Sequence, residues 1–311
     1  MSEQFRPHKY ELMTVYLGID IGGTKIAAGL VTENGEVLRQ SRVPTPLSGG
    51  SAILDAALAL AREYASEPIA AIGVGTGGQV NAELGVIVSA TDLLPGWAGT
   101  NVKAAFETAF SIPCFAGNDV NALAVGESRF RAGRNLDTVV YLALGTGVGG
   151  ALLLNGRLHH GAHWAGAEFG HLLLTISEVG TRRTLEDFAS GPGLVQTYSE
   201  MSSLGRQTTG EAIAEEARRD PNSLSAQAVT RTGEYLGFGL VSLANSLDPD
   251  LIVIGGGLSA LGGLLLDPAR RILVQYALPG PAQCPVVLAA LGPDASLVGA
   301  AALAMPVEGE L

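Results

Sequence analysis

The sequence predicts an α/β fold made of two similar halves, and three observations lead to this expectation. Residues 16–31 and 138–161 each contain an apolar β-like run, a turn with glycine and threonine, and a second apolar run. An Asn-Gly pair follows the second apolar run in both cases, at 34–35 and at 155–156. This pair is the strongest short signal for a β-hairpin. Helical stretches and buried strands alternate after each hairpin, as they do in α/β proteins. The repeated order of features indicates a duplicated domain.

The remaining elements are expected in chain order. The runs 70–77 and 250–257 have the composition of buried strands that end in glycine loops. The apolar run 251–266 contains five glycines and is short for a membrane span, so we expect a buried strand and a loop there. The chain has 311 residues, which exceeds the usual size of one core and favours two domains. Helices are expected over residues 52–65, 102–110, 120–131, 211–219 and 226–247, with a last helix over 296–305.

Composition narrows the class of protein. The formal net charge is −11, and no basic run is present, so we expect no nucleic-acid partner. Residues 1–14 are polar and charged, unlike a signal peptide, and no membrane partner is expected. Two cysteines, Cys114 and Cys284, are too few for a disulfide framework. These features favour a cytoplasmic protein.

The stretch Asp20-Ile21-Gly22-Gly23-Thr24-Lys25 places an acid inside an apolar β-run and two glycines directly after it. A carboxylate in such a run is costly unless it is paired, solvated or acts on a cation. Adjacent glycines let the backbone turn tightly and approach a ligand. A strand follows instead of a helix, which excludes the Rossmann and Walker A loops. The stretch is therefore suited to hold something small and charged on main-chain N–H groups.

Seven motifs lie along the chain: DIGGTK (20–25), PGW (95–97), GNDVNALAVGE (117–127), LGTGVGG (144–150), GAEFGH (166–171), LEDFASG (185–191) and IVIGGG (252–257). Taken together and in this order, they resemble the ROK family of sugar kinases, and the resemblance covers nearly the whole chain from about Val15 onward. It implies an actin/hexokinase-like (duplicated RNase H-like) fold with a cleft between two lobes. The small lobe is expected over 13–117 and is completed by a C-terminal helix within 296–311, whereas the large lobe covers 118–295.

Asp119 is the expected catalytic residue. Local sequence alone places it before a helix, where an Asp is first of all a plausible N-cap. The resemblance implies that it is the base that takes the proton of the acceptor hydroxyl during phosphoryl transfer. The two roles are compatible.

The resemblance also implies the residues that bind the substrates. Carboxylates and an imidazole suit a sugar, because each hydroxyl of a sugar can both donate and accept. Asp20 is expected to face the Mg²⁺-nucleotide phosphates through metal-bound water. The sugar-binding set is Asn118, Asp119, Glu168, His171, Glu186 and Gly78. The ATP-binding set is Asp20, Gly22, Gly23, Thr24, Lys25, Gly145, Thr146, Gly147, Gly255, Gly256 and Gly257.

Several of these residues also have a purely structural alternative role. Asp20 could simply accept hydrogen bonds from the turn, Glu168 and His171 could form an exposed pair, and the glycines at 255–257 could be a strand-end turn. Trp97 is expected to pack in the core and not to stack on a sugar. Four histidines, at 159, 160, 163 and 171, are expected in an exposed loop and not around a metal.

One segment departs from the family pattern. The family carries a cysteine-rich zinc loop after its Glu-x-Gly-His motif, but residues 172–184 contain no cysteine. Structural zinc is therefore expected to be absent, with Mg²⁺ and ATP as the cofactors. His171 therefore has to be positioned without a zinc ligand set beside it.

The predicted function is an ATP-dependent hexose kinase, most specifically a glucokinase that phosphorylates the 6-hydroxyl of glucose. Other hexoses (mannose, fructose or an N-acetylhexosamine) and polyphosphate as donor are the alternatives within the family. A sugar-responsive repressor of the same family is disfavoured, because the short segment before the first strand leaves no room for a helix-turn-helix domain. A homodimer or homotetramer is expected from the resemblance.

Overall fold

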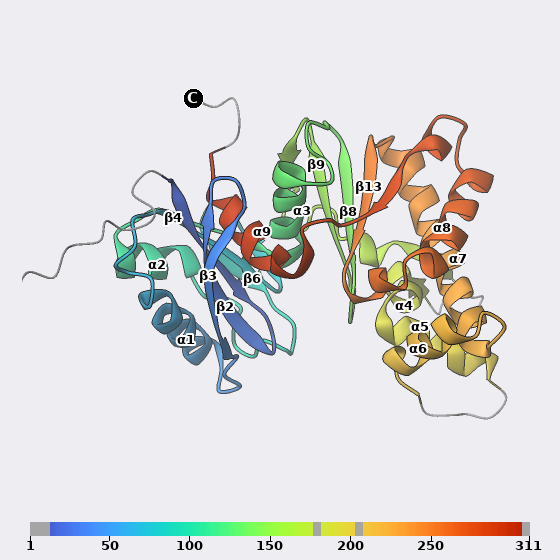
Figure 1. Ribbon diagram of the computed structural model, residues 1–311, viewed down its shortest axis with the longest axis horizontal. Helices are drawn as coiled ribbons and strands as arrows, with labels where there is room; N and C mark the ends of the chain where they lie inside the picture. Colours follow the sequence, from blue (N-terminus) through green and yellow to red (C-terminus); the bar gives the residue numbers. More distant parts are fainter. Residues whose placement is uncertain (1–12, 177–181, 203–207, 307–311) are drawn as a thin grey trace, which may run out of the picture. The chain divides into compact units, whose positions relative to one another are not determined.

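The computed structural model describes residues 13–176, 182–202 and 208–306, and the chain divides into two compact units (Figure 1). Of the described residues, those at 13–130 and 291–306 form the first unit, and those between Arg131 and Ala290 form the second. The main sheets have the strand orders β3-β2-β1-β4-β7 and β10-β9-β8-β13-β14. In each, an antiparallel hairpin is extended by parallel strands at its first strand. The predicted α/β class and its duplication are confirmed.

The main sheet of the first unit is covered by helices on both faces. Its strands are β1 (Val15–Ile21), β2 (Lys25–Thr32), β3 (Val37–Pro44), β4 (Ile69–Thr76) and β7 (Cys114–Asn118). The helices are α1 (Gly50–Arg62), α2 (Val102–Phe110), α3 (Asp119–Phe130) and α9 (Ala295–Leu303). Because successive strand residues point to opposite faces, alternate β1 residues meet different helices.

The β1 strand shows how this two-sided burial arises. Leu17, Ile19 and Ile21 share one core cluster with residues of α1 and α2. Tyr16 instead clusters with residues of α9, and a Cβ on Gly18 would collide with the Leu297 carbonyl of that helix. A strand buried on both faces needs a nearly continuous apolar sequence, which the 16–31 stretch has. Asp20 lies on the same face as Gly18, toward α9.

Helix α3 belongs to the first unit, although we expected the second lobe to begin at residue 118. The reason is its close crossing with α9. A Cβ on Gly299 would lie 2.6 Å from the Ala122 carbonyl oxygen, and a Cβ on Gly126 would lie 3.0 Å from the Gly299 Cα. Glycines on both helices therefore allow the two backbones to approach more closely than larger residues would permit.

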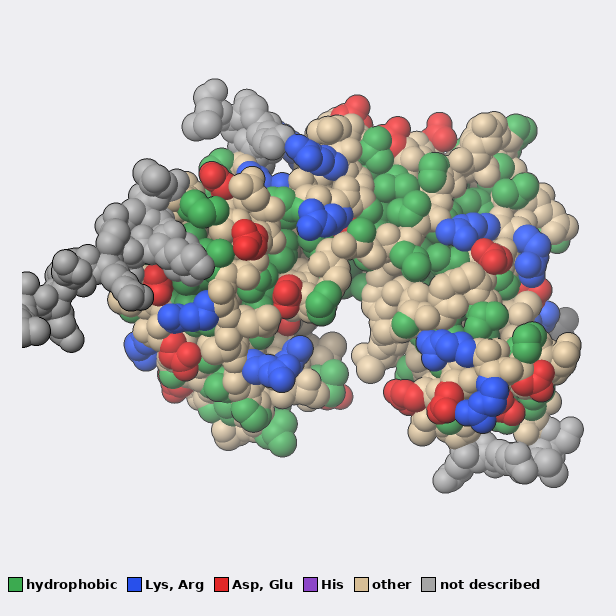
Figure 2. All heavy atoms as spheres, in the orientation of Figure 1, with side chains coloured by type: hydrophobic (Ala, Val, Ile, Leu, Met, Phe, Trp, Pro, Cys, Tyr) green, Lys and Arg blue, Asp and Glu red, His purple; other side chains and the backbone are tan. Residues whose placement is uncertain are grey.

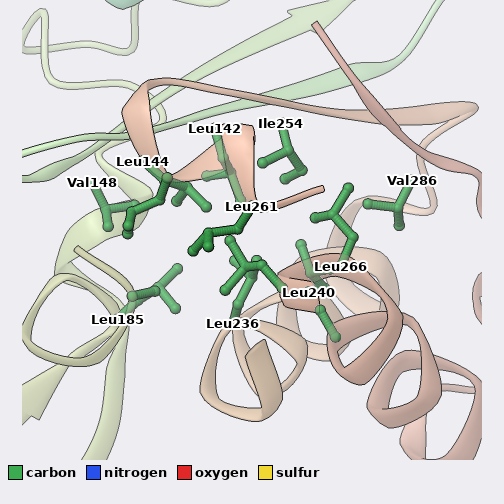
Figure 3. Close-up of a cluster of buried hydrophobic side chains, with 14 of the residues drawn as sticks. Leu142, Leu144, Val148, Leu185, Leu236, Leu240, Ile254, Leu261, Leu266 and Val286 are labelled. Carbon is green, nitrogen blue, oxygen red and sulfur yellow. The ribbon is translucent and has the colours of Figure 1, made fainter. Parts of the chain in front are cut away.

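In the described part of the second unit, five helices and the sheet share one buried hydrophobic cluster. The strands are β8 (Val139–Leu144), β9 (Val148–Leu154), β10 (Arg157–Leu158), β13 (Leu251–Gly255) and β14 (Val286–Leu288). The helices are α4 (Leu185–Ala189), α5 (Gly191–Met201), α6 (Gly210–Arg219), α7 (Leu224–Leu247) and α8 (Gly263–Tyr276). Leu142 and Ile254 of the sheet meet Leu236 and Leu240 of α7 in a buried cluster (Figure 3).

Short elements complete both units. They are β5 (Gln79–Asn81) with β6 (Val86–Ser89), β11 (Leu173–Ile176) with β12 (Arg182–Thr184), and the 3₁₀ turns η1 (Phe169–His171), η2 (Gly257–Leu261), η3 (Pro281–Gln283) and η4 (Gly292–Asp294). Part of the 172–184 segment, residues 177–181, lies outside the described residues. Helix α8 begins inside the 251–266 run, where we expected a loop; the glycines at 262–263 and Pro268 within the helix obscure its pattern.

The surface carries charges of both signs. On the face shown in Figure 2, Lys and Arg side chains lie among Asp and Glu side chains and do not gather into a basic patch. Within the described ranges, none of the helices is both long and apolar enough to span a bilayer.

The α3–α9 crossing can be tested by replacing Gly299 with alanine. The added methyl group has no space beside the Ala122 carbonyl, so we expect the free energy of unfolding to fall by about 1–3 kcal/mol, the usual cost of overpacking. Urea denaturation measures this loss. Gly280→Ala is the control, because no described atom lies within 4 Å of its Cβ position and its φ is −72°. Equal stability of the two variants would contradict the close crossing.

Candidate active site

The carboxyl ends of three parallel strands bring the expected residues of the first unit together. In the β1–β4–β7 register, Ile21 pairs with Thr76, and Thr76 pairs with Asn118. The preceding row consists of Asp20, Gly75 and Gly117. Ligands of open α/β sheets bind beyond the carboxyl ends of their strands, so this edge is the candidate site of the first unit.

Asn118, and not Asp119, is the residue that caps helix α3. The Asn118 Oδ1 accepts hydrogen bonds from the backbone N–H groups of Val120 (2.9 Å) and Asn121 (3.2 Å). Asp119 is the first residue of the helix, and its Oδ1 accepts from Val120 N–H at 2.9 Å. The capping role that local sequence suggests for Asp119 is therefore largely filled by its neighbour. The Asp119 carboxylate is therefore not needed as the helix cap and can interact with a ligand.

Asp119 has an unusual electrostatic environment. Its side chain reaches solvent, yet protein atoms crowd around the carboxyl group, and this desolvation raises its pKa to about 6. The hydrogen bond from Val120 N–H opposes the rise in pKa, and the nearby negative charge of Asp20 adds to it. Such a group is ionised at neutral pH and binds a proton more readily than an ordinary aspartate does.

Asp20 is the second carboxylate at this edge. Burial raises its pKa, while a hydrogen bond with the Ser296 side chain and the positive charge of Lys25 lower it. Ser296 lies in the first turn of α9, the helix that covers this face of β1. Sequence analysis did not single out Ser296, because it lies far along the chain from Asp20.

The glycine turn after Asp20 is held by hydrogen bonds. Gly22 N–H donates to the Lys25 carbonyl at 3.0 Å, and the Thr45 hydroxyl donates to the Gly22 carbonyl at 2.6 Å. The backbone N–H of Thr45 donates to the Thr24 carbonyl at 3.1 Å. A Cβ on Gly23 would lie 2.7 Å from the Leu93 Cβ, so packing requires glycine there. Thr24 and Lys25 are exposed.

Gly78 is joined to Asn118 directly. The Asn118 Nδ2 donates to the Gly78 carbonyl at 2.9 Å, which ties the loop after β4 to the start of α3. Gly78 has φ of 98°, a conformation that favours glycine, and a Cβ there would collide with the Ser89 carbonyl. Of the residues predicted to bind sugar, Asn118, Asp119 and Gly78 therefore lie together.

In the second unit, Glu186 braces the turn formed by residues 145–147. Its Oε2 accepts a hydrogen bond from Val148 N–H at 2.9 Å, directly after the turn. Gly145 N–H donates to the Gly147 carbonyl at 2.8 Å, and Gly191 N–H donates to the Gly145 carbonyl at 2.8 Å. A predicted sugar-binding residue thus contacts the predicted phosphate turn, a link that sequence reasoning missed.

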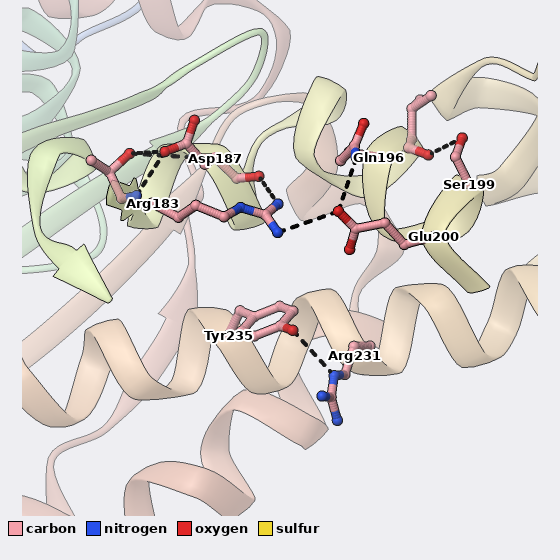
Figure 4. A network of polar contacts seen from close by, with 9 residues as sticks. Arg183, Asp187, Gln196, Ser199, Glu200, Arg231 and Tyr235 are labelled. Atoms are coloured by element: carbon pink, nitrogen blue, oxygen red, sulfur yellow. Dashed lines mark hydrogen bonds and ion pairs between the residues drawn. The ribbon is translucent and has the colours of Figure 1, made fainter. Parts of the chain in front are cut away.

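A polar network fixes the helix that carries Glu186. The Thr184 and Asp187 side chains form a capping box at the start of α4. The Arg183 guanidinium lies 3.9 Å from the centre of the Phe188 ring. It also pairs with Glu200 at 3.3 Å (Figure 4). These contacts hold β12, α4 and α5 together, so Glu186 is positioned by its surroundings.

The glycines at 255–257 lie against the end of β8. Gly256 has φ of 83°, and a Cβ there would collide with the backbone of Leu144, so both the conformation and the packing require glycine. At Gly145 and Gly257, by contrast, φ is not positive and no described atom lies within 4 Å of the Cβ position. The protein itself does not require glycine at these two positions, and the space suits a ligand that approaches the backbone.

Glu168 and His171 lie on one 3₁₀ turn. His171 N–H donates to the Glu168 carbonyl at 3.1 Å, and both side chains are exposed, so they project from the same side of the turn. Ala167, the preceding residue, has φ of 65°, which is strained for alanine, and strain of this kind clusters at functional sites. Among the described residues, no group of three or more His, Cys, Asp or Glu side chains is arranged to hold a metal ion.

Comparisons with known proteins agree with this geometry. The model of the ROK family matches residues 16–306. A glucokinase from Streptomyces coelicolor is 33% identical over 94% of this chain and 98% of its own length. An N-acetyl-D-glucosamine kinase from Salmonella paratyphi B is 32% identical over 83% of this chain and 89% of its own length.

A solved structure is similar over the same extent. It is a ROK family glucokinase from Streptomyces griseus in complex with glucose and AMPPNP. The two chains are 32% identical, the TM-score is 0.78, and the similarity covers 93% of this chain and 99% of that one. The strand order, the glycine turns and the acidic residues described above thus occur in a chain that belongs to the ROK family.

Proposed function

We propose that this protein is an ATP-dependent glucokinase that transfers the γ-phosphoryl group of ATP to the 6-hydroxyl of glucose. The observation that carries the proposal is the Asp119 carboxylate, with a pKa raised to about 6, beside the glycine turn at the carboxyl ends of β1, β4 and β7. The similarity to glucokinases over most of the chain supports it further.

Asp119 suits the role of general base. The attacking hydroxyl loses its proton as its oxygen bonds to the γ-phosphorus, while the bond from that phosphorus to the β,γ-bridging oxygen breaks and ADP leaves. A carboxylate takes up this proton more effectively when its pKa lies closer to neutral pH. Desolvation of Asp119 moves its pKa in that direction while leaving most of the group ionised at pH 7.

The remaining residues suit the two substrates. We assign Asn118, Gly78, Glu168 and His171 to the sugar, and the turns at 22–25, 145–147 and 255–257 to the nucleotide. Glu186 would act on the sugar and on the 145–147 turn, because it already contacts Val148 N–H. Main-chain N–H groups bind phosphates without a basic surface, which reconciles a net charge of −11 with a polyanionic substrate.

Asp20 suits Mg²⁺. Its carboxylate is a hard oxygen donor and its charge raises the pKa of Asp119, so Mg²⁺ held at Asp20 would reduce that repulsion. Mg²⁺, when bound with ATP, neutralises charge on the phosphates. The cleft between lobes, the lack of structural zinc and a homo-oligomer stay predictions. Two exposed aromatic residues, Phe238 on α7 and Tyr276 at the end of α8, offer a surface for association.

Replacing Asp119 with asparagine tests the catalytic assignment. Asparagine keeps the size of the side chain but cannot take a proton, so we expect kcat to fall by about 10²- to 10⁴-fold. Calorimetric titration should show that glucose still binds within a few-fold of the wild-type affinity. Asp55→Asn, at an exposed position on α1, is the control and should keep full turnover. Substantial turnover by D119N would remove Asp119 from the mechanism.

The raised pKa of Asp119 also predicts a pH dependence of stability. In the folded protein this group holds its proton more tightly than in the unfolded chain, so stability is lost as pH rises through about 6. Asparagine is neutral throughout. The difference in Tm, D119N minus wild type, should therefore rise between pH 4.5 and 7.5 by roughly 2–4 °C, the effect of ~1 kcal/mol in a domain of this size.

This shift is measured by thermal denaturation of the ligand-free protein in buffers of equal ionic strength. Asp55→Asn is the control and should show no such trend, because it removes a carboxylate at an exposed position. A constant difference between D119N and wild type across this range would mean that the Asp119 carboxylate is ordinarily solvated.

The sugar and the donor are tested together by measuring product formation with Mg-ATP. We expect glucose to give the highest kcat/KM among glucose, mannose, fructose, N-acetylglucosamine and N-acetylmannosamine, with zinc removed by a chelator and Mg²⁺ in excess. A parallel series replaces ATP with polyphosphate and detects the sugar phosphate. A higher rate with an N-acetylhexosamine would place the chain functionally beside its Salmonella relative. Absence of product from every sugar and both donors would overturn the proposal.

A further inference from the structure

A buried chain of hydrogen bonds reaches the candidate site from Trp97. The Trp97 side chain is fully buried, and its Nε1–H donates to the Thr76 hydroxyl oxygen at 3.0 Å. Trp97 is therefore a core residue, as the sequence predicted, and its indole N–H also makes a specific hydrogen bond to Thr76. A buried N–H needs an acceptor, and this one orients the Thr76 hydroxyl by occupying one of its lone pairs.

The Thr76 hydroxyl has one proton and two carbonyl acceptors. It lies 3.2 Å from the Ile21 carbonyl oxygen and 3.4 Å from the Gly77 carbonyl oxygen. Gly77 N–H also donates to the Ile21 carbonyl at 3.4 Å. Both side-chain distances are long for O–H···O bonds, so neither acceptor fully satisfies the proton. The hydroxyl can therefore strengthen one of these bonds only by weakening the other.

The two carbonyls belong to loops with different roles in the proposed function. Ile21 leads directly into the Gly22–Lys25 turn, which we assign to the nucleotide. Gly77 leads into Gly78, whose carbonyl accepts from Asn118 Nδ2 on the sugar side. Thr76 is completely buried at the end of β4, between β1 and β7, and thus bridges the two loops.

We propose that Thr76 is a positioning residue that couples nucleotide binding to sugar binding, through a hydroxyl shared between the Ile21 and Gly77 carbonyls. This rests on the proposed function. A ligand that displaces the 22–25 turn strengthens or weakens the hydrogen bond from the Thr76 hydroxyl to the Ile21 carbonyl. The hydrogen bond from the same hydroxyl to the Gly77 carbonyl then changes in the opposite direction. By linkage, the sugar must change the affinity for the nucleotide by the same factor.

Thr45 provides a matched control. Its hydroxyl also donates to a carbonyl of the nucleotide turn, that of Gly22 at 2.6 Å, and its side chain is buried. Its hydrogen bonds all go to the 22–25 turn, at Gly22 and Thr24. Removing either threonine hydroxyl should therefore weaken nucleotide binding, but the loss of the Thr76 hydroxyl should also affect the sugar.

The experiment measures the affinity for glucose by calorimetric titration, with and without saturating AMPPNP and Mg²⁺, in variants of the full chain. The ratio of the two dissociation constants is the coupling factor. In the wild type we expect a factor of about 5 or more, within the usual range for coupled sites. Thr76→Val should reduce the factor at least threefold, Thr76→Ser should restore it, and Thr45→Val should leave it unchanged while weakening AMPPNP binding.

Trp97→Phe gives a second, independent variant. It removes the indole donor but keeps the Thr76 hydroxyl, so the proton loses its fixed orientation, and the coupling factor should fall at least twofold. This variant decides the question if Thr76→Val does not fold, because the valine leaves a buried indole N–H without its acceptor. A purely structural role for Thr76 would lower Tm without changing the coupling factor.

The outcomes separate this inference from the proposed function. A wild-type coupling factor of one, or an unchanged factor in both Thr76→Val and Trp97→Phe, would overturn the coupling role while sugar phosphorylation by the wild type stands. Failure of the wild type to phosphorylate any sugar would overturn the proposed function instead. If another sugar gives the highest rate, that sugar replaces glucose in the titrations.

Discussion

The register of three parallel strands is the constraint on which the first half of the candidate site depends. Because β1, β4 and β7 are aligned residue by residue, their carboxyl ends lie side by side, and the segments that follow leave the sheet at one edge. These segments are the 22–25 turn, the Gly77-Gly78 loop and the start of α3. A shift of one residue in β4 would move Thr76 to the opposite face and away from Trp97. The hydrogen bonds among Ile21, Thr76 and Trp97 therefore both depend on this register and help to fix it.

The electrostatics of this edge explain how a strongly acidic protein can handle an anionic substrate. Protein atoms around the two carboxylates raise the pKa of each, although the Asp119 side chain also reaches solvent. Under the proposed function, a cation that arrives with the nucleotide would reduce the repulsion between these carboxylates. The phosphates, in turn, would meet backbone N–H groups and Lys25, and not a field of basic side chains.

Sequence reasoning predicted the parts of the molecule whose signals are local. The Asn-Gly hairpins, the glycine turns and most helices are encoded within short windows, and helix α2 begins and ends where expected, at Val102 and Phe110. The roles of Asn118 as a cap and of Glu186 as a brace for residues 145–147 were missed. Each depends on how the side chain is oriented toward its partner, and a short stretch of sequence does not reveal that orientation. Thr76 did leave a signal, a polar residue at the end of the apolar run 70–77, but its meaning required Trp97 and Ile21 beside it.

Helix α9 shows most clearly why the remainder could not be read from local sequence. It comes from the end of the chain, yet it covers one face of the first sheet, against glycines 18 and 73 of β1 and β4. Its first turn supplies Ser296 to Asp20, and its Gly299 permits the close approach of α3, the helix that carries Asp119. Both carboxylates therefore acquire their surroundings only when residues 295–303 have packed. Since the second unit lies between these segments in the chain, the first unit cannot complete its core until the second has been synthesised.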